Sequence, residues 1–171
     1  MPAGFDHLNE LPLEEAEAAF LKCCASARWS HRMAHLCPFQ SVEQLLDSAD
    51  RVWGELKSGD WLEAFQQHPK IGEKRAAAAQ TPQAGDWASD EQLGMRNARA
   101  ELLDSLTKAN RAYEDRFGYI FIVCATGKTA EEMLALLKQR LHNAPDAEIR
   151  IAAEEQRRIT RLRLEKLLRG E

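Results

Sequence analysis

Apolar residues recur along most of the chain at steps of three and four, which is the period of an amphipathic helix. The clearest early stripe consists of Leu13, Ala16, Phe20 and Cys24, and it predicts a helix over about 12–27. Similar stripes predict short helices over 29–36, 41–58 and 60–67, and longer ones over 89–117, 129–142 and 145–169. The pattern is therefore that of an all-α protein.

Two segments interrupt this helical pattern. Residues 70–87 contain Gly72, Pro82 and Gly85, a composition that predicts a mobile loop. Residues 119–125 form a continuous apolar run that is too short for its period to distinguish a strand from a buried extended segment. Neither side of 70–87 has enough helices for a core of its own, so we predict one domain over residues 1–171. The expected fold is a single-domain helical bundle with one short extended apolar segment.

Composition and charge narrow the class of protein. The 171 residues include 23 basic and 27 acidic side chains, a net charge of −4, which gives no basic signature for nucleic acid or for an anionic membrane. No apolar run approaches the roughly 20 residues that a membrane span needs. The cysteines form no CxxC pair, and we expect them to be reduced and mostly buried: Cys23, Cys24, Cys37 and Cys124. Reduced cysteines, and a C-terminus without a Ser-Lys-Leu address, predict a cytoplasmic protein.

Two further patterns suggest binding sites. His31 and His35 are four residues apart on a predicted helix, with Cys37 just beyond, which is a spacing found in metal sites. The pattern lacks the other ligands of a zinc site, so we favour the interpretation that both histidines are exposed or cap a helix. The predicted helix over 145–169 carries seven basic residues that could meet phosphate. Glutamates interleave with them, which favours a solvated face with ion pairs and leaves room for one arginine to turn inward.

His68 is the strongest candidate for chemistry. It precedes Pro69, which disfavours the α conformation for the preceding residue, so the helix over 60–67 must end here. The helix dipole at such a C-terminus favours a protonated imidazole, a candidate general acid near neutral pH. The alternative is a helix-end residue with only a local hydrogen bond. Glu91 would orient the ring if the two segments meet, although both Glu91 and Gln92 have the competing interpretation of helix caps.

Four motifs occur in the order and spacing of one known family: Gln67–Gly72, Ser89–Gln92, Tyr113–Gly127 and Ile159–Leu164. Together with the neighbourhoods of Trp29, Phe65 and Arg140, they cover nearly the whole chain. The sequence resembles the 2-oxo-4-hydroxy-4-carboxy-5-ureidoimidazoline (OHCU) decarboxylases of the urate-to-allantoin pathway. The resemblance implies an all-α homodimer that converts OHCU, a small molecule, to (S)-allantoin and carbon dioxide without a metal or an organic cofactor.

The resemblance also implies roles for individual residues. His68 would be the catalytic acid/base, Glu91 the carboxylate that orients it, and Pro69 the residue that shapes its loop. Gln92 would hydrogen-bond the ring or ureido group, and Arg163 would hold an anionic or carbonyl oxygen. An extended segment would line the pocket and offer backbone amides and carbonyls: Ile120, Phe121, Ile122, Val123 and Cys124.

The sequence departs from the family pattern at one position. The family has a serine three residues before the glutamate, whereas here Ala88 stands at that place and Ser89 lies one residue nearer. Ser89 either contacts the substrate or only caps a helix. Two other functions remain open. One is an α-helical binding module that uses the basic C-terminal helix, and the other is a lyase or hydrolase that acts on a related ureido acid.

Overall fold

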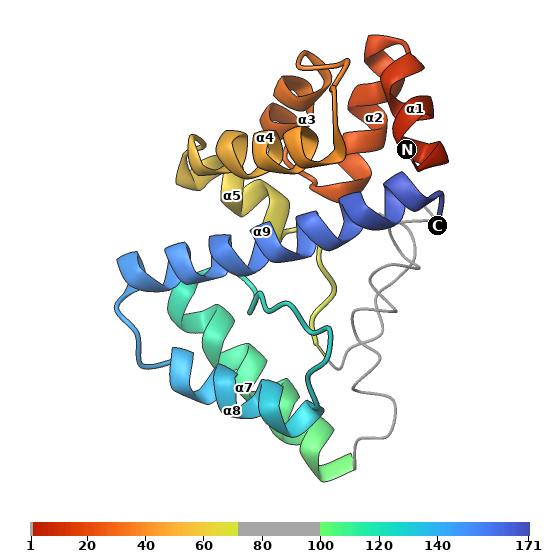
Figure 1. Cartoon of the computed structure of the whole chain (residues 1–171). Coiled ribbons are helices and arrows are strands. Elements are labelled where there is room, and N and C mark those ends of the chain that lie inside the picture. Colours follow the sequence, from red (N-terminus) through yellow and green to blue (C-terminus); the bar gives the residue numbers. More distant parts are fainter. Residues whose placement is uncertain (1, 72–99) are drawn as a thin grey trace. The chain divides into compact units, whose positions relative to one another are not determined.

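The structure, a computed structural model, describes residues 2–71 and 100–171, and all regular structure within those ranges is helical (Figure 1). The all-α prediction is thus confirmed. The helices are α1 (Ala3–Glu10), α2 (Leu13–Cys23), α3 (Ala27–Ala34), α4 (Val42–Gly54), α5 (Ser58–Phe65), α7 (Ala100–Phe117), α8 (Ala130–Arg140) and α9 (Pro145–Arg169). The loop predicted over 70–87 and the start of the helix predicted over 89–117 lie largely outside the described residues.

The chain divides into two compact units, each described here by itself. Unit 1 comprises Met1–Ala64 and Arg157–Glu171, and unit 2 comprises Phe65–Gln156. Helix α9 belongs to both, because its first part lies in unit 2 and its second part in unit 1. A single domain over the whole chain remains a prediction.

Unit 1 is built on the packing of α2 against α3 and of α3 against α4. Trp29 is fully buried at its centre, with its ring edge-on to Phe20 at 5.9 Å and its indole N–H donating to the Ala49 carbonyl at 3.1 Å. Cys23 and Cys24 are also fully buried here, and all four cysteines are free. Since Cys124 is buried and Cys37 half-buried, the prediction for the cysteines is confirmed.

Unit 2 places α7 against α8 and packs an extended segment on them. The core contains every second residue of that segment, Phe121, Val123 and Ala125, together with Tyr113 of α7 and Met133 of α8. Alternation of this kind is the geometry of extended chain, whose successive side chains point in opposite directions. Residues 121–125 are therefore buried extended chain, Tyr119 and Ile120 before them are half-buried, and no strand is assigned to the segment.

Helix ends match the predicted ranges in several places and depart from them in others. Thr129, at the predicted start of α8, forms a capping box with Glu132, and Gly118, with a φ of +81°, follows the predicted end of α7. The predicted boundary at Ser58 is wrong, because α4 ends at Gly54 and Ser58 begins α5. Helix α1 was not predicted at all: its buried positions are only Phe5 and Leu8, too few to establish a period.

Candidate functional site

The loop that follows α5 carries His68 and is attached to α7 by two contacts. The Ile71 carbonyl accepts a hydrogen bond from Nδ2 of the buried Asn110 at 2.9 Å. The Lys70 ammonium lies 2.7 Å from the Glu114 carboxylate. The backbone N–H of His68 donates to the Phe65 carbonyl at 3.2 Å, which places the imidazole directly at the end of α5, as the His-Pro pair predicted.

Two adjacent residues of α9 contact the two segments that carry predicted site residues. His68 Nε2 lies 2.5 Å from Oε1 of Gln156, whose side chain is fully buried. The backbone N–H of Cys124 donates to Oε2 of Glu155 at 2.7 Å. The His68 loop and the extended segment are thus anchored at consecutive positions of one helix. Neither contact follows from local sequence patterns, because the partners are 88 and 31 residues apart.

The extended segment obtains its backbone hydrogen bonds from side chains. Nη1 of Arg140 donates to the Ile122 carbonyl at 2.7 Å, and Nζ of Lys128 donates to the Cys124 carbonyl at 2.7 Å. Together with the Glu155 contact, these bonds satisfy groups that a neighbouring strand would otherwise pair. Three long side chains therefore fix the backbone of the predicted pocket lining.

A buried ionic cluster supports this arrangement. The Glu148 side chain has no exposed surface, and its Oε1 accepts from Nε of Arg140 at 2.7 Å and from the Tyr113 hydroxyl. Its Oε2 accepts from Nδ2 of Asn143 at 2.8 Å. The Arg140 guanidinium lies over the Phe121 ring at 4.5 Å. Burial, followed by the bond to Glu148, raises the pKa of the Tyr113 hydroxyl far above its usual range, so Tyr113 is a neutral donor.

A model of the family described as OHCU decarboxylase matches residues 9–165. The chain belongs to the OHCU decarboxylase family. It is 36% identical over 157 residues to the Arabidopsis thaliana uric acid degradation bifunctional protein TTL, and it spans about half (48%) of that protein's length. It is 28% identical over 172 residues to the 2-oxo-4-hydroxy-4-carboxy-5-ureidoimidazoline decarboxylase of Amia calva, of which it covers 92%. The chain also matches two bacterial bifunctional proteins, and it spans 25% and 31% of their lengths.

The fold comparison agrees with this membership. A crystal structure of an OHCU decarboxylase in the presence of (S)-allantoin matches with a TM-score of 0.76 and 34% identity. The match covers 89% of this chain and 97% of that chain. The family suggested by the motifs in the sequence is therefore confirmed.

The structure brings some of the predicted site residues into one unit and leaves others out. His68, Pro69 and the segment Ile120–Cys124 all belong to unit 2. Arg163 belongs to unit 1, where it is 6% exposed and its charge acts on the buried Cys23 and Cys24. It is thus an arginine of α9 that turns inward. The other predicted site residues lie outside the described residues: Ala88, Ser89, Glu91 and Gln92.

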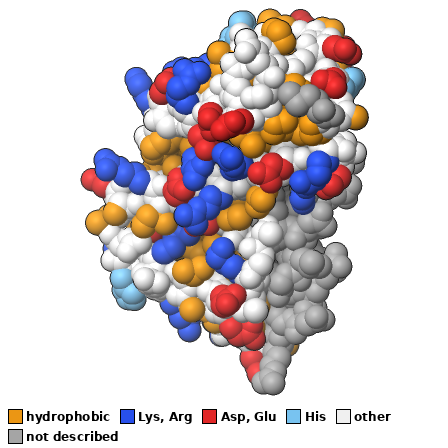
Figure 2. Space-filling view, in the orientation of Figure 1, with side chains coloured by type: hydrophobic (Ala, Val, Ile, Leu, Met, Phe, Trp, Pro, Cys, Tyr) orange, Lys and Arg blue, Asp and Glu red, His pale blue; other side chains and the backbone are white. Residues whose placement is uncertain are grey.

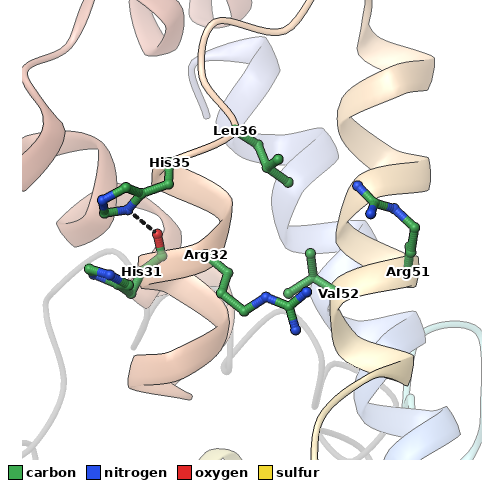
Figure 3. A pocket seen from close by; sticks show the side chains of 6 residues that line it. All are labelled: His31, Arg32, His35, Leu36, Arg51 and Val52. Carbon is green, nitrogen blue, oxygen red and sulfur yellow. Dashed lines mark hydrogen bonds between the residues drawn. The ribbon is translucent and has the colours of Figure 1, made fainter.

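The histidine pair that raised the question of a metal lies beside a surface pocket of about 330 Å³ in unit 1 (Figure 3). Nδ1 of His31 lies 3.1 Å from the Glu17 carboxylate, and Nδ1 of His35 lies 2.9 Å from the His31 carbonyl. Both histidines are exposed, as predicted. Within 2–71 and 100–171, no cluster of three potential metal ligands occurs, and no helix is long and apolar enough to cross a membrane.

The basic residues of α9 are partly engaged in ion pairs. Arg157 and Arg161 both contact the Asp50 carboxylate, at 2.8 and 3.2 Å, and Arg161 also lies 3.8 Å from Glu165. Figure 2 shows Lys and Arg side chains interspersed with Asp and Glu on the visible face. The predicted pairing of interleaved charges along the helix is found in Arg161–Glu165, whereas the partner of Arg157 and Arg161 at Asp50 belongs to α4. The predicted solvated face is wrong for Glu148, which is buried.

Proposed function

We propose that this chain catalyses the decarboxylation of OHCU to (S)-allantoin in urate degradation, with His68 as the general acid/base. The observation that carries the proposal is the OHCU decarboxylase family match over 9–165, which includes the His68 loop, the extended segment and Arg163. The position of His68 at the end of α5, with its ring against a buried glutamine, supports the same role.

The reaction requires that the enzyme hold the substrate in one orientation and deliver one proton to it. Breaking the bond to the carboxylate carbon releases carbon dioxide and leaves an electron pair on the ring carbon, which the adjacent C=N group takes up. The product of this step is an enol that joins the two ring carbons. A proton from the His68 imidazole then reaches one face of the neighbouring, ureido-bearing carbon, the hydroxyl group loses its proton and becomes the carbonyl, and the fixed position of His68 sets the chirality of the product. General acid catalysis of this kind contributes about 10²–10⁴-fold. Because the substrate itself accepts the electron pair, the proposal requires neither a metal nor an organic cofactor.

The remaining site residues keep the roles that the family resemblance gives them. Glu91 orients the His68 ring, Gln92 hydrogen-bonds the substrate, and Arg163 holds an anionic or carbonyl oxygen. Pro69 shapes the loop, and the segment Ile120–Cys124 lines the pocket. We propose substrate contact for Ala88 and Ser89 as well, with helix capping as the alternative role of Ser89. We further propose a cytoplasmic homodimer, for which sedimentation velocity of the purified chain gives the oligomeric state.

A coupled optical assay tests this function. Urate oxidase and hydroxyisourate hydrolase generate OHCU in place, and circular dichroism follows the formation of enantiopure allantoin. We expect the chain to produce the (S) enantiomer well above the spontaneous background, and His68→Ala to lower kcat by about 10²–10⁴-fold. His142→Ala is the matched control, because His142 is an exposed histidine of the same unit at the end of α8.

Racemic product at the background rate with the wild-type chain would refute the proposal. A panel of related ureido acids in the same assay would then test the lyase or hydrolase alternative. The binding-module alternative is less well supported, because Arg157 and Arg161 of the basic helix already contact Asp50.

A further inference from the structure

The contacts of α9 in unit 2 point to a function for two residues that the sequence analysis did not single out. We propose that Gln156 and Glu155 are positioning residues that assemble the catalytic site: Gln156 fixes the His68 imidazole, and Glu155 fixes the backbone of the pocket-lining segment at Cys124. The inference rests on the proposed function for its effect on turnover. Its structural part, the orientation of the ring, is measured independently of catalysis.

Gln156 suits this role because it is a buried neutral acceptor. Its side chain has no exposed surface, and its Oε1 lies 2.5 Å from His68 Nε2. In this orientation of the amide, Nε2 carries the proton and donates it, so the ring is held in one tautomer. A neutral acceptor serves both the neutral imidazole and the imidazolium, because Nε2 is a donor in each. Gln156 therefore holds the ring at Nε2 throughout a cycle in which Nδ1 gives and regains the proton.

Glu155 does the same for the other part of the site. Its Oε2 accepts the Cys124 backbone N–H at 2.7 Å, a charge-assisted hydrogen bond. Within 2–71 and 100–171 no strand lies beside the segment, and the side-chain contacts there determine where its amides and carbonyls lie. Since Glu155 and Gln156 are consecutive on a rigid helix, they fix the His68 loop and the segment relative to each other within unit 2. A displacement of about 1 Å in such a constellation costs about 10²-fold in rate.

The first test observes the His68 ring directly. Protein labelled with ¹⁵N in its histidine rings, one of five being His68, gives nitrogen shifts that report the tautomer, and His68→Asn assigns the signals. We expect wild-type Nε2 to carry a slowly exchanging proton, and Gln156→Met, which is close in shape, to lose that protection. Gln156→Glu places a carboxylate against Nε2 and should raise the midpoint of the His68 titration by about 1–3 pH units. A purely structural role for Gln156 predicts neither change.

The second test uses the coupled assay and separates the two residues. We expect Gln156→Met to lower kcat by about 10²-fold with a smaller change in KM, because the proton donor is displaced. Glu155→Leu should mainly raise KM, because it loosens the pocket lining, and Glu155→Gln should restore most of the loss by keeping an acceptor. Arg150→Gln, an exposed substitution on the same helix, is the control. Far-UV circular dichroism shows whether each variant folds.

Each outcome decides one part of the proposal. If Gln156→Met and Gln156→Glu leave the His68 ring signals and kcat unchanged, the role of Gln156 is wrong. If Glu155→Leu leaves KM unchanged, the role of Glu155 is wrong. If the ring signals respond as expected while the wild-type chain does not decarboxylate OHCU, the proposed function fails and the placement of the ring stands.

Discussion

Replacing Glu148 by glutamine tests whether the buried cluster of unit 2 is held by charge. Glu148 is completely buried and lies against the largely buried Arg140, whose Nη2 is 2.6 Å from Oε1 in an ionic contact. Glutamine keeps the size of the side chain and an acceptor for Arg140, but it leaves the guanidinium without a counter-charge. Its amide nitrogen would face Nδ2 of Asn143, so a donor would meet a donor.

Both effects have known magnitudes. Removing one partner of a buried ion pair costs about 3–5 kcal/mol, because the remaining charge is uncompensated. A buried donor left without an acceptor costs about 1–3 kcal/mol, and relaxation of Asn143 recovers part of that. We therefore expect Glu148→Gln to lower the free energy of unfolding by about 4–6 kcal/mol, a large share of the roughly 5–15 kcal/mol typical of a folded chain.

Urea denaturation at pH 7, followed by far-UV circular dichroism, measures this loss. The matched control is Glu114→Gln on α7, which makes the same substitution in the Lys70–Glu114 pair, where the side chains are 37% and 40% exposed. We expect the control to lose less than about 1 kcal/mol. Equal small losses in both variants would refute the reasoning, since burial would then make no difference to the value of the charge.

Three further changes test other parts of the fold. Gly4→Ala places a Cβ 2.5 Å from the Leu167 carbonyl oxygen and should destabilise unit 1 by about 1–3 kcal/mol. The control is Gly54→Ala, whose Cβ meets nothing within 4 Å and should leave the stability unchanged. Equal melting temperatures for the two variants would contradict this expectation. Thr129→Ala removes the capping box of α8 and should cost about 1 kcal/mol in thermal denaturation, with Thr129→Ser largely neutral. Burial raises the pKa of the Cys24 thiol from 9.0 to about 11, so the unfolded chain releases this proton first and stability falls as pH rises above 9.0. Between pH 8 and 10.5 the wild type should lose about 2 kcal/mol more than Cys24→Ala in urea, and parallel losses would show that the thiol is not buried.

The part of the fold that was predicted from the sequence depends on short-range rules. Thr129 and Glu132 are three residues apart, and a capping box needs nothing beyond that spacing. Gly118 takes a positive φ that few other residues adopt, so it ends α7 as expected. The boundary between α4 and α5 differs from the predicted range 41–58 because α4 ends at Gly54 and not at Ser58.

The part of the site that was not predicted depends on contacts between distant segments. His68 was identified from its neighbour Pro69, which constrains the backbone locally. The side chain that contacts its ring lies 88 residues further along the chain. The family resemblance supplied Arg163 and the segment Ile120–Cys124, and spacing alone did not suggest either as part of a site.

Helix α9 shows which signal in the sequence could have revealed the rest. Charges of both signs alternate along this helix, a pattern that predicts one solvated face. Several of its polar and charged side chains are nevertheless buried: Glu148, Gln156, Thr160 and Arg163. These positions follow the same steps of three and four as the buried Ala152, Ile159, Leu164 and Leu168, so they lie on the stripe that the helical period assigns to the core. Burying a polar group without a partner costs free energy, so a polar residue on that stripe requires a specific partner. Glu148 meets Arg140 and Gln156 meets His68. In a charged helix, polar residues that lie on the apolar stripe therefore indicate buried contacts. The number of charged residues and their net charge do not reveal which of them are buried.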